Sequence, residues 1–114
     1  MKRYTVRVRQ QDKDIFLQIK NGQKTVETRA ATIKHKNIKK GDILIFVCGN
    51  DKIEKEILKA SLFKSISQML KYYKIKQIMP SVKTKQEMEK VYYSFSGYQE
   101  KIKKHGLIAL ELSN

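Results

Sequence analysis

The chain has 114 residues, the length of one domain, and carries 25 Lys and Arg side chains against 11 Asp and Glu, a formal net charge of +14. Its longest apolar run, ILIFVC at 43–48, is far shorter than the roughly 20 residues of a membrane span, and its N-terminal segment lacks the apolar core of a secretory signal. Because Cys48 is the only cysteine and His35 and His105 are far apart, we expect an intracellular protein, cytoplasmic or nuclear, without an internal disulfide, a metal or another cofactor.

The first predicted element is a strand over residues 3–9, where apolar and polar side chains alternate with the period of a half-buried strand. The apolar face carries Tyr4, Val6 and Val8. The opposite face carries three of the four arginines in the chain, Arg3, Arg7 and Arg9. This face is either simply solvated or suited to phosphate contacts, because a guanidinium binds phosphate through paired hydrogen bonds.

A short helix is predicted next. Its apolar stripe is formed by Ile15, Phe16 and Ile19. The dipeptide Asn21-Gly22 follows and is a typical helix stop, because glycine adopts the left-handed conformation without strain.

Residues 24–29, KTVETR, come directly after this stop and are predicted to be extended. Alternation then places Lys24, Val26 and Thr28 on one face and Thr25, Glu27 and Arg29 on the other. On a solvated strand, Glu27 and Arg29 would form an exposed ion pair that contributes only ~0–1 kcal/mol. In a concave site, the charged groups of this segment would instead form a donor–acceptor–donor array of the kind that base or nucleotide recognition requires.

The middle of the chain reads as a loop followed by a hairpin. Residues 30–40 are rich in lysine and are predicted to cross the surface, with Ile33 and Ile38 as isolated apolar anchors. A core strand at 43–48 and a second strand at about 53–63 are separated by the turn residues GND, which predicts an antiparallel hairpin.

Helical signals dominate the rest of the chain. Three helix starts are predicted where a Ser or Thr is followed three residues later by Gln or Glu, at Ser65, Thr84 and Ser96. Gly106 ends the last helix, and LIALEL at 107–112 is a closing strand that we expect to lie beside the first strand. This order of elements predicts an α+β domain with a curled sheet.

Two stretches of the sequence resemble a known family. The run IFLQIKNGQKTVETRAATIKHKNIKKGDILIF is similar to the opening of the ASCH (activating signal cointegrator homology) domain, within the PUA-like superfamily. The family pattern of G-x-K-x-x-E-x-R, a variable loop and G-D is matched by Gly22, Lys24, Glu27, Arg29, Gly41 and Asp42. The second half also resembles the family, with a helix, an I-x-P turn, a helix ending in paired aromatics and a glycine before an apolar last strand. Because the resemblance spans nearly the whole chain, it implies a single domain over residues 1–114.

This resemblance implies a PUA-like small curled β-barrel of about five to six mostly antiparallel strands flanked by three to four helices. It also implies a cleft lined by the G-x-K-x-x-E-x-R residues. The family is thought to bind RNA or modified nucleotides, and some members are enzymes, including a bacterial amidohydrolase branch that acts on acetylcytidine and members with nuclease activity. Lys24 matches the catalytic lysine of the amidohydrolase branch, but that branch has a threonine in place of Glu27, and its catalytic glutamate has no secure counterpart here.

The charge favours a polyanionic partner, of which nucleic acid is the commonest. Lysine is also enriched by the codon bias of an AT-rich genome, so the positions of the few arginines, which recognise phosphate in a planar geometry, are more informative than the total. The leading hypothesis is a non-enzymatic module that binds RNA or a single nucleotide. Its expected contact residues are Lys24, Thr25, Glu27, Arg29, Arg7, Arg9 and Tyr98, the last by stacking on a base.

Two alternatives stay open. The first is a small hydrolase acting on a modified nucleoside such as acetylcytidine, or on RNA, with Lys24 as general base or electrostatic stabiliser and Glu27 as its partner. The second is a protein–protein adaptor whose lysines only provide solubility.

Overall fold

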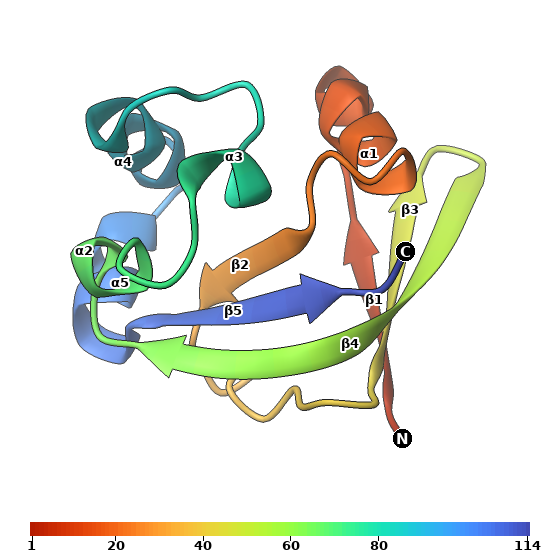
Figure 1. Cartoon of the computed structure of the whole chain (residues 1–114), viewed down its shortest axis with the longest axis horizontal. Coiled ribbons are helices and arrows are strands. Elements are labelled where there is room, and N and C mark those ends of the chain that lie inside the picture. Colours follow the sequence, from red (N-terminus) through yellow and green to blue (C-terminus); the bar gives the residue numbers. More distant parts are fainter.

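The computed structural model describes residues 1–114, the whole chain (Figure 1). The five strands are β1 (Arg3–Arg7), β2 (Val26–Ala30), β3 (Ile43–Cys48), β4 (Asp51–Phe63) and β5 (Leu107–Leu112). A short 3-10 turn, η1 (Gln10–Asp12), leads into the first of five helices: α1 (Lys13–Lys20), α2 (Ile66–Met69), α3 (Ile75–Ile78), α4 (Lys85–Tyr93) and α5 (Tyr98–His105). The predicted α+β class with a curled, mostly antiparallel sheet is confirmed. The helices number five rather than three to four because α2 and α3 are separate segments of four residues each, too short for a periodic pattern.

The sheet has the strand order β1-β3-β4-β5-β2, with β1 parallel to β3 and every other pair antiparallel. The first half of the long strand β4 pairs with β3 and the second half with β5, and an irregularity between Ile57 and Lys59 separates the two registers. Because β4 turns through this point, the sheet curls into a half-barrel (Figure 1). The expectation that the first and last strands are neighbours is wrong, since β5 lies between β4 and β2. The unpaired edges are therefore β1 and β2.

Two groups of buried apolar side chains fill the two sides of the curled sheet. One includes Val26 and Leu107 of the sheet and lies beneath the helices α2 to α5, which gather at one end of the molecule (Figure 1). The other includes Phe46 and Ile57 and is covered by Ile19 of α1. The predicted apolar stripe of α1 is thus confirmed at Phe16 and Ile19, which are both buried, whereas Ile15 stays on the exposed side.

The helix caps follow the sequence signals in two of three cases. The hydroxyls of Ser65 and Thr84 accept hydrogen bonds from the backbone N–H groups three residues later, as an N-cap does. The start predicted at Ser96 is wrong. The helix α5 begins at Tyr98, because Gly97 turns the chain through a left-handed conformation with φ 71° directly before it.

The loop between β2 and β3 is held by a few buried groups. Ile38 is buried and confirms one predicted anchor, but Ile33 is 82% exposed, so the other anchor is wrong. At the end of the loop, the carboxylate of Asp42 is buried and accepts hydrogen bonds from the backbone N–H of Lys2 at 2.9 Å and of Lys39 at 3.0 Å. Burial alone would raise the pKa of Asp42, but these two N–H groups lower it. The G-D part of the motif therefore serves the fold.

Gly106, between α5 and β5, has φ 75° and ψ −160°, a conformation that is essentially restricted to glycine. A Cβ atom there would lie 2.2 Å from the carbonyl oxygen of Phe63. We expect Gly106→Ala to lower the free energy of unfolding by about 2 kcal/mol, measured by urea denaturation. The matched control is Gly41→Ala, where φ is also positive but no atom lies within 4 Å of the added Cβ. An equal cost in both variants would contradict a role for the close approach to Phe63.

Candidate functional site

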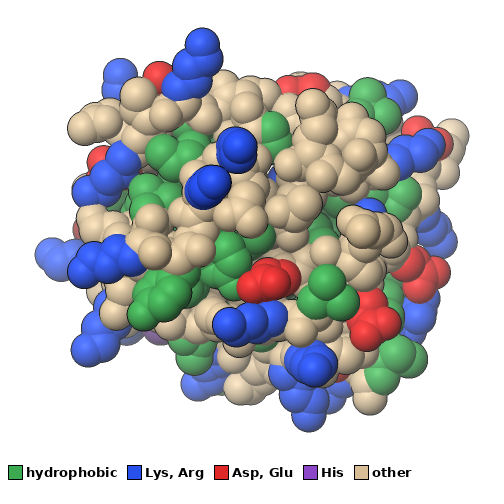
Figure 2. Space-filling view, in the orientation of Figure 1, with side chains coloured by type: hydrophobic (Ala, Val, Ile, Leu, Met, Phe, Trp, Pro, Cys, Tyr) green, Lys and Arg blue, Asp and Glu red, His purple; other side chains and the backbone are tan.

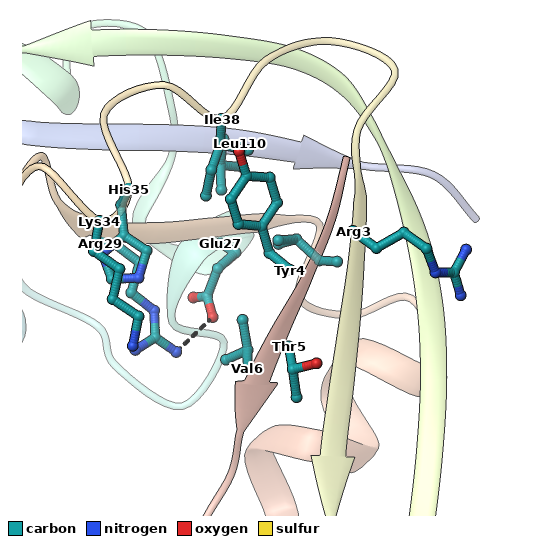
Figure 3. Close-up of a pocket in the computed structure, with 11 residues that line it drawn as sticks. Arg3, Tyr4, Thr5, Val6, Glu27, Arg29, Lys34, His35, Ile38 and Leu110 are labelled. Carbon is teal, nitrogen blue, oxygen red and sulfur yellow. Dashed lines mark hydrogen bonds and ion pairs between the residues drawn. The ribbon is translucent and has the colours of Figure 1, made fainter. Parts of the chain in front are cut away.

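The opening between the two edge strands, β1 and β2, contains two hollows. The larger one, called the main cleft from here on, has a volume of about 560 Å³, within the range of about 300–1,000 Å³ typical of small-molecule sites. The smaller one, the side hollow, has a volume of about 210 Å³ (Figure 3). Glu27 and Arg29 line both hollows, so the two hollows share this pair.

Lys24, Glu27 and Arg29 form a chain of charges along the wall of the main cleft. The Lys24 ammonium lies 3.4 Å from Oε1 of Glu27, and the Arg29 guanidinium lies 3.3 Å from Oε2. The Lys24 and Glu27 side chains are only 7% and 10% exposed, whereas that of Arg29 is 33% exposed. The carboxylate is therefore compensated on both sides within the protein, and the exposed end of the chain of charges is the guanidinium.

Lys24 joins Glu27 and Arg29 although strand alternation assigns it to the opposite face. The strand β2 begins only at Val26, so the period of two does not extend back to Lys24. Its backbone N–H donates to the carbonyl of Gln18 at 3.0 Å, and its ammonium donates to the carbonyl of Ile78 at 2.5 Å. These bonds fix the lysine between α1 and α3, and the predicted facing of Lys24 is corrected accordingly.

Electrostatics in this group favours the ionised carboxylate. Burial of Glu27 would raise its pKa, but the charges of Lys24 and then Arg29, with a hydrogen bond from the backbone N–H of Thr28, lower it below its usual value. The same carboxylate raises the pKa of Arg29 against the opposing effect of burial. At neutral pH the group is thus two cations around one anion and has a net positive charge.

The outer edge of β2 is closed to pairing with another strand. The N–H of Thr28 donates to Oε1 of Glu27 at 3.0 Å, and the N–H of Ala30 donates to the hydroxyl of Tyr98 at 3.0 Å. The hydroxyls of Thr28 and Tyr92 also form a hydrogen bond, and burial raises the pKa of Tyr92. Because side chains already satisfy these edge donors, a ligand in the opening would meet side chains rather than a free backbone edge.

The structure places six of the seven predicted contact residues on the main cleft: Lys24, Glu27, Arg29, Arg7, Arg9 and Tyr98. Thr25 does not line it, because its N–H donates to the carbonyl of Gln77 and its carbonyl accepts from the N–H of Leu112. Arg7 is exposed and makes no ion pair, whereas Arg9 is paired with Asp12 at 2.8 Å. The role of these residues in binding stays a prediction.

Tyr98 belongs to an aromatic cluster on the wall of the main cleft. The rings of Tyr92 and Tyr98 stack with centroids 6.3 Å apart and an interplanar angle of 7°, and Phe95 meets Tyr98 edge-on at 5.7 Å. The ammonium of Lys101 lies 6.0 Å from the centre of the Tyr98 ring. Phe95 is 42% exposed, the most accessible ring of the three. Tyr98 was predicted from the sequence as a stacking residue, whereas Tyr92 and Phe95 were not predicted to line the cleft.

The remaining surface is broadly basic. Figure 2 shows Lys and Arg side chains distributed around the whole of one face rather than gathered in one patch. No helix has the length and apolar character needed to cross a membrane. No group of three or more His, Cys, Asp or Glu side chains is arranged to hold a metal ion.

Fold and site together define a small α+β half-barrel protein with a partly basic cleft at the open side of its sheet. The family model of the ASCH domain matches residues 12–114, and the chain belongs to the ASCH domain family. This confirms the family that the sequence resembles.

Two solved structures are similar to this chain. The crystal structure of hypothetical protein PH0355 is 30% identical, covers 97% of each chain and has a TM-score of 0.84. The solution structure of protein PF0455 from Pyrococcus furiosus is 28% identical, covers 98% of this chain and 94% of that chain, and has a TM-score of 0.72. No curated protein matches the chain.

Proposed function

We propose that the chain is a binding module for RNA or a single nucleotide and that it takes a base into the main cleft. The observation that carries this proposal is the convergence of cationic and aromatic side chains on one cleft of suitable volume. The cationic residues are Arg7, Arg9, Lys24, Arg29 and Lys101. The aromatic residues are Tyr92, Phe95 and Tyr98. The ASCH domain has a PUA-like fold often linked to RNA binding, which supports the same function.

The cations and rings would act on different parts of a nucleotide. Arg29 has an exposed guanidinium edge and would donate to a phosphate or a base carbonyl, while Arg7 would extend the phosphate contacts along β1. Tyr98 and the more exposed Phe95 would stack on the base, an interaction that tolerates any sequence. Glu27 would hold Arg29 and Lys24 in place, and its remaining lone pairs would accept from a base amine.

The geometry of Lys24 favours binding over hydrolysis. Its ammonium donates to the carbonyl of Ile78 and lies beside the Glu27 carboxylate, so two of its three N–H directions point at the protein. A lysine fixed in this way is suited to supplying positive charge to the cleft wall. A general base would instead need a free lone pair aimed at the substrate.

The affinity of the protein for a short single-stranded RNA should fall steeply with salt, because phosphate contacts release counterions. If the protein engages five phosphates through its cleft and the surrounding basic surface, the slope of log K against log salt is about −3.5, at roughly −0.7 per contact. Fluorescence anisotropy titrations at several salt concentrations measure this slope. Lys101→Ala should make the slope less steep by about 0.7, whereas Lys52→Ala, on an exposed part of β4, is the matched control and should leave it unchanged.

Two outcomes would overturn the binding proposal. A flat salt response, or equal effects of Lys101→Ala and Lys52→Ala, would remove the electrostatic role of the cleft. Turnover of acetylcytidine or cleavage of labelled RNA by the purified protein, lost in Lys24→Ala, would establish the hydrolase alternative instead.

A further inference from the structure

The side hollow shares the Glu27–Arg29 pair with the main cleft and is otherwise lined by different residues. Its walls come from β1, β2 and the loop that follows β2, with one residue each from β3 and β5. The apolar part is formed by Tyr4, Val6, Ile38, Leu44 and Leu110. Its volume of about 210 Å³ is several times the roughly 30 Å³ occupied by one water molecule, so it has room for a tetrahedral anion.

Three basic side chains gather at one side of this hollow: Arg29, Lys34 and His35 (Figure 3). Arg3 also lines the hollow, but its guanidinium extends away and pairs with Glu54 at 2.5 Å. Glu27 is the only carboxylate in the lining, and both of its oxygens are already bonded to groups of the protein. The hollow therefore has an excess of hydrogen-bond donors with positive charge and no free anion to balance them.

Arg29 itself has an unused donor. Its Nε is the one buried side-chain polar atom in the chain without a hydrogen-bond partner. A buried N–H donor of this kind is costly to leave without an acceptor. The same guanidinium donates to Glu27 through Nη2, so only part of its hydrogen-bonding capacity is used within the protein. An anion beside Arg29 would supply the acceptor that the fork lacks.

We propose that the side hollow is a phosphoryl subsite, in which Arg29, Lys34 and His35 hold a phosphate group whose base occupies the main cleft. This inference rests on the proposed nucleotide-binding function and assigns its ligand two parts, one in each hollow. Arg29 contacts both parts, whereas Lys34 and His35 contact the phosphate alone. The phosphate comes either from a free nucleoside monophosphate or from the backbone of an RNA strand.

An anion in the hollow would change the titration of His35. Burial, followed by the positive charges of Arg29 and Lys34, lowers the pKa of His35, so the imidazole is mainly neutral at neutral pH. The other charged and titratable groups of the hollow are Arg3 and Tyr4 of β1 and Glu27 of β2. A bound dianion offsets the repulsion by Arg29 and Lys34 and raises the pKa of His35, and it binds more tightly at lower pH.

The direct test is an NMR titration of both histidine imidazoles in the full chain with inorganic sulfate, a tetrahedral dianion that does not itself titrate between pH 5 and 8. Sulfate is expected to raise the pKa of His35 and to leave exposed His105, at the end of α5, nearly unchanged. Lys34→Ala should weaken sulfate binding about fivefold to tenfold. Lys36→Ala, an exposed lysine in the same turn that does not line the hollow, should have no effect. Equal responses of the two histidines, or of the two lysine variants, would overturn the subsite.

A second titration uses uridine, uridine 5′-monophosphate and a uridine dinucleotide, and it separates this inference from the binding function. Lys34→Ala should weaken binding of one or both phosphate-containing ligands about fivefold to tenfold and leave uridine binding unchanged. If the variant loses affinity for the monophosphate alone, the subsite binds a terminal phosphate. If it loses affinity for the dinucleotide, the subsite binds a phosphate of the RNA backbone. If all three ligands bind Lys34→Ala as they bind the wild type, the subsite is wrong and the cleft stands. If none of the three ligands binds the wild type while sulfate still raises the pKa of His35, the nucleotide function is wrong and the anion site stands.

Discussion

Replacing Glu27 by glutamine is expected to lower the free energy of unfolding by about 3 kcal/mol, because it leaves two cations without their shared anion. Lys24 is the more severely affected, since it is buried and keeps only the carbonyl of Ile78 as a partner. Arg29 is partly exposed, so water replaces part of the interaction that it loses with Glu27. The expected cost is therefore at the lower end of the range for broken buried ion pairs. Urea denaturation at neutral pH measures the difference.

The same variant should also change the response to acid. Lys24 and Arg29 outweigh burial and hold the pKa of Glu27 below its usual 4.5, so its contribution to stability is present above that pH and is lost as the pH falls through the lower folded value. Glu27→Gln should therefore lose less stability than the wild type between neutral pH and about pH 3, with the remaining acid sensitivity due in part to Asp42. The matched control is Glu54→Gln, which removes an exposed pair with Arg3 and should cost almost nothing. Equal losses in the two variants would contradict the buried triad.

Replacing Arg29 by lysine is expected to weaken binding of single-stranded RNA by about 30- to 100-fold while retaining the positive charge. Lysine keeps a single ammonium near Glu27 but removes the planar fork that serves both hollows, so at least two charge-assisted hydrogen bonds to the ligand are lost. Because an ion pair with Glu27 remains possible, the fold should lose much less stability than in Glu27→Gln. Anisotropy titrations with the same short RNA, together with urea denaturation, separate the two effects.

Arg3→Lys provides the comparison for this variant, because the Arg3 guanidinium points away from the side hollow and pairs with Glu54. It should bind RNA within about twofold of the wild type, as expected for a change remote from the ligand. A loss in Arg3→Lys that matches Arg29→Lys would mean that RNA responds to the general basicity of the surface. In that case the converging geometry of the opening would have no special role.

The strands and longer helices could be predicted because local patterns determine them. The alternation over residues 3–7, the apolar run of β3 and the cap at Thr84 each act over a few residues and are confirmed, although β1 ends at Arg7 and not at the predicted residue 9. The position of β5 could not be predicted, because it depends on where β4 bends and changes partner near Ile57. The start of α5 was misjudged because the left-handed conformation of Gly97 overrides the cap signal at Ser96.

The candidate site was predictable in its charged members and in Tyr98, but not in the rest of its surroundings. The spacing of Lys24, Glu27 and Arg29 identified the cluster, although the facing of Lys24 depends on tertiary bonds to Gln18 and Ile78. The aromatic wall comes from helices about 70 residues further along the chain, and no local pattern links it to β2. Lys34 and His35 lie in a loop that reads as solvated, and only its packing against the edge strand β1 turns it into the wall of a hollow.

The central claim is that the ligand enters the opening between β1 and β2, and amide NMR of the isotope-labelled protein during titration with a short single-stranded RNA tests it most directly. The account predicts that the largest shifts fall on the edge amides of Thr28 and Ala30 and on the Phe95–Tyr98 segment, with the outer face of β4 around Lys52 and Lys59 unchanged. Large shifts confined to the outer face of β4, with the amides of the opening unmoved, would contradict it.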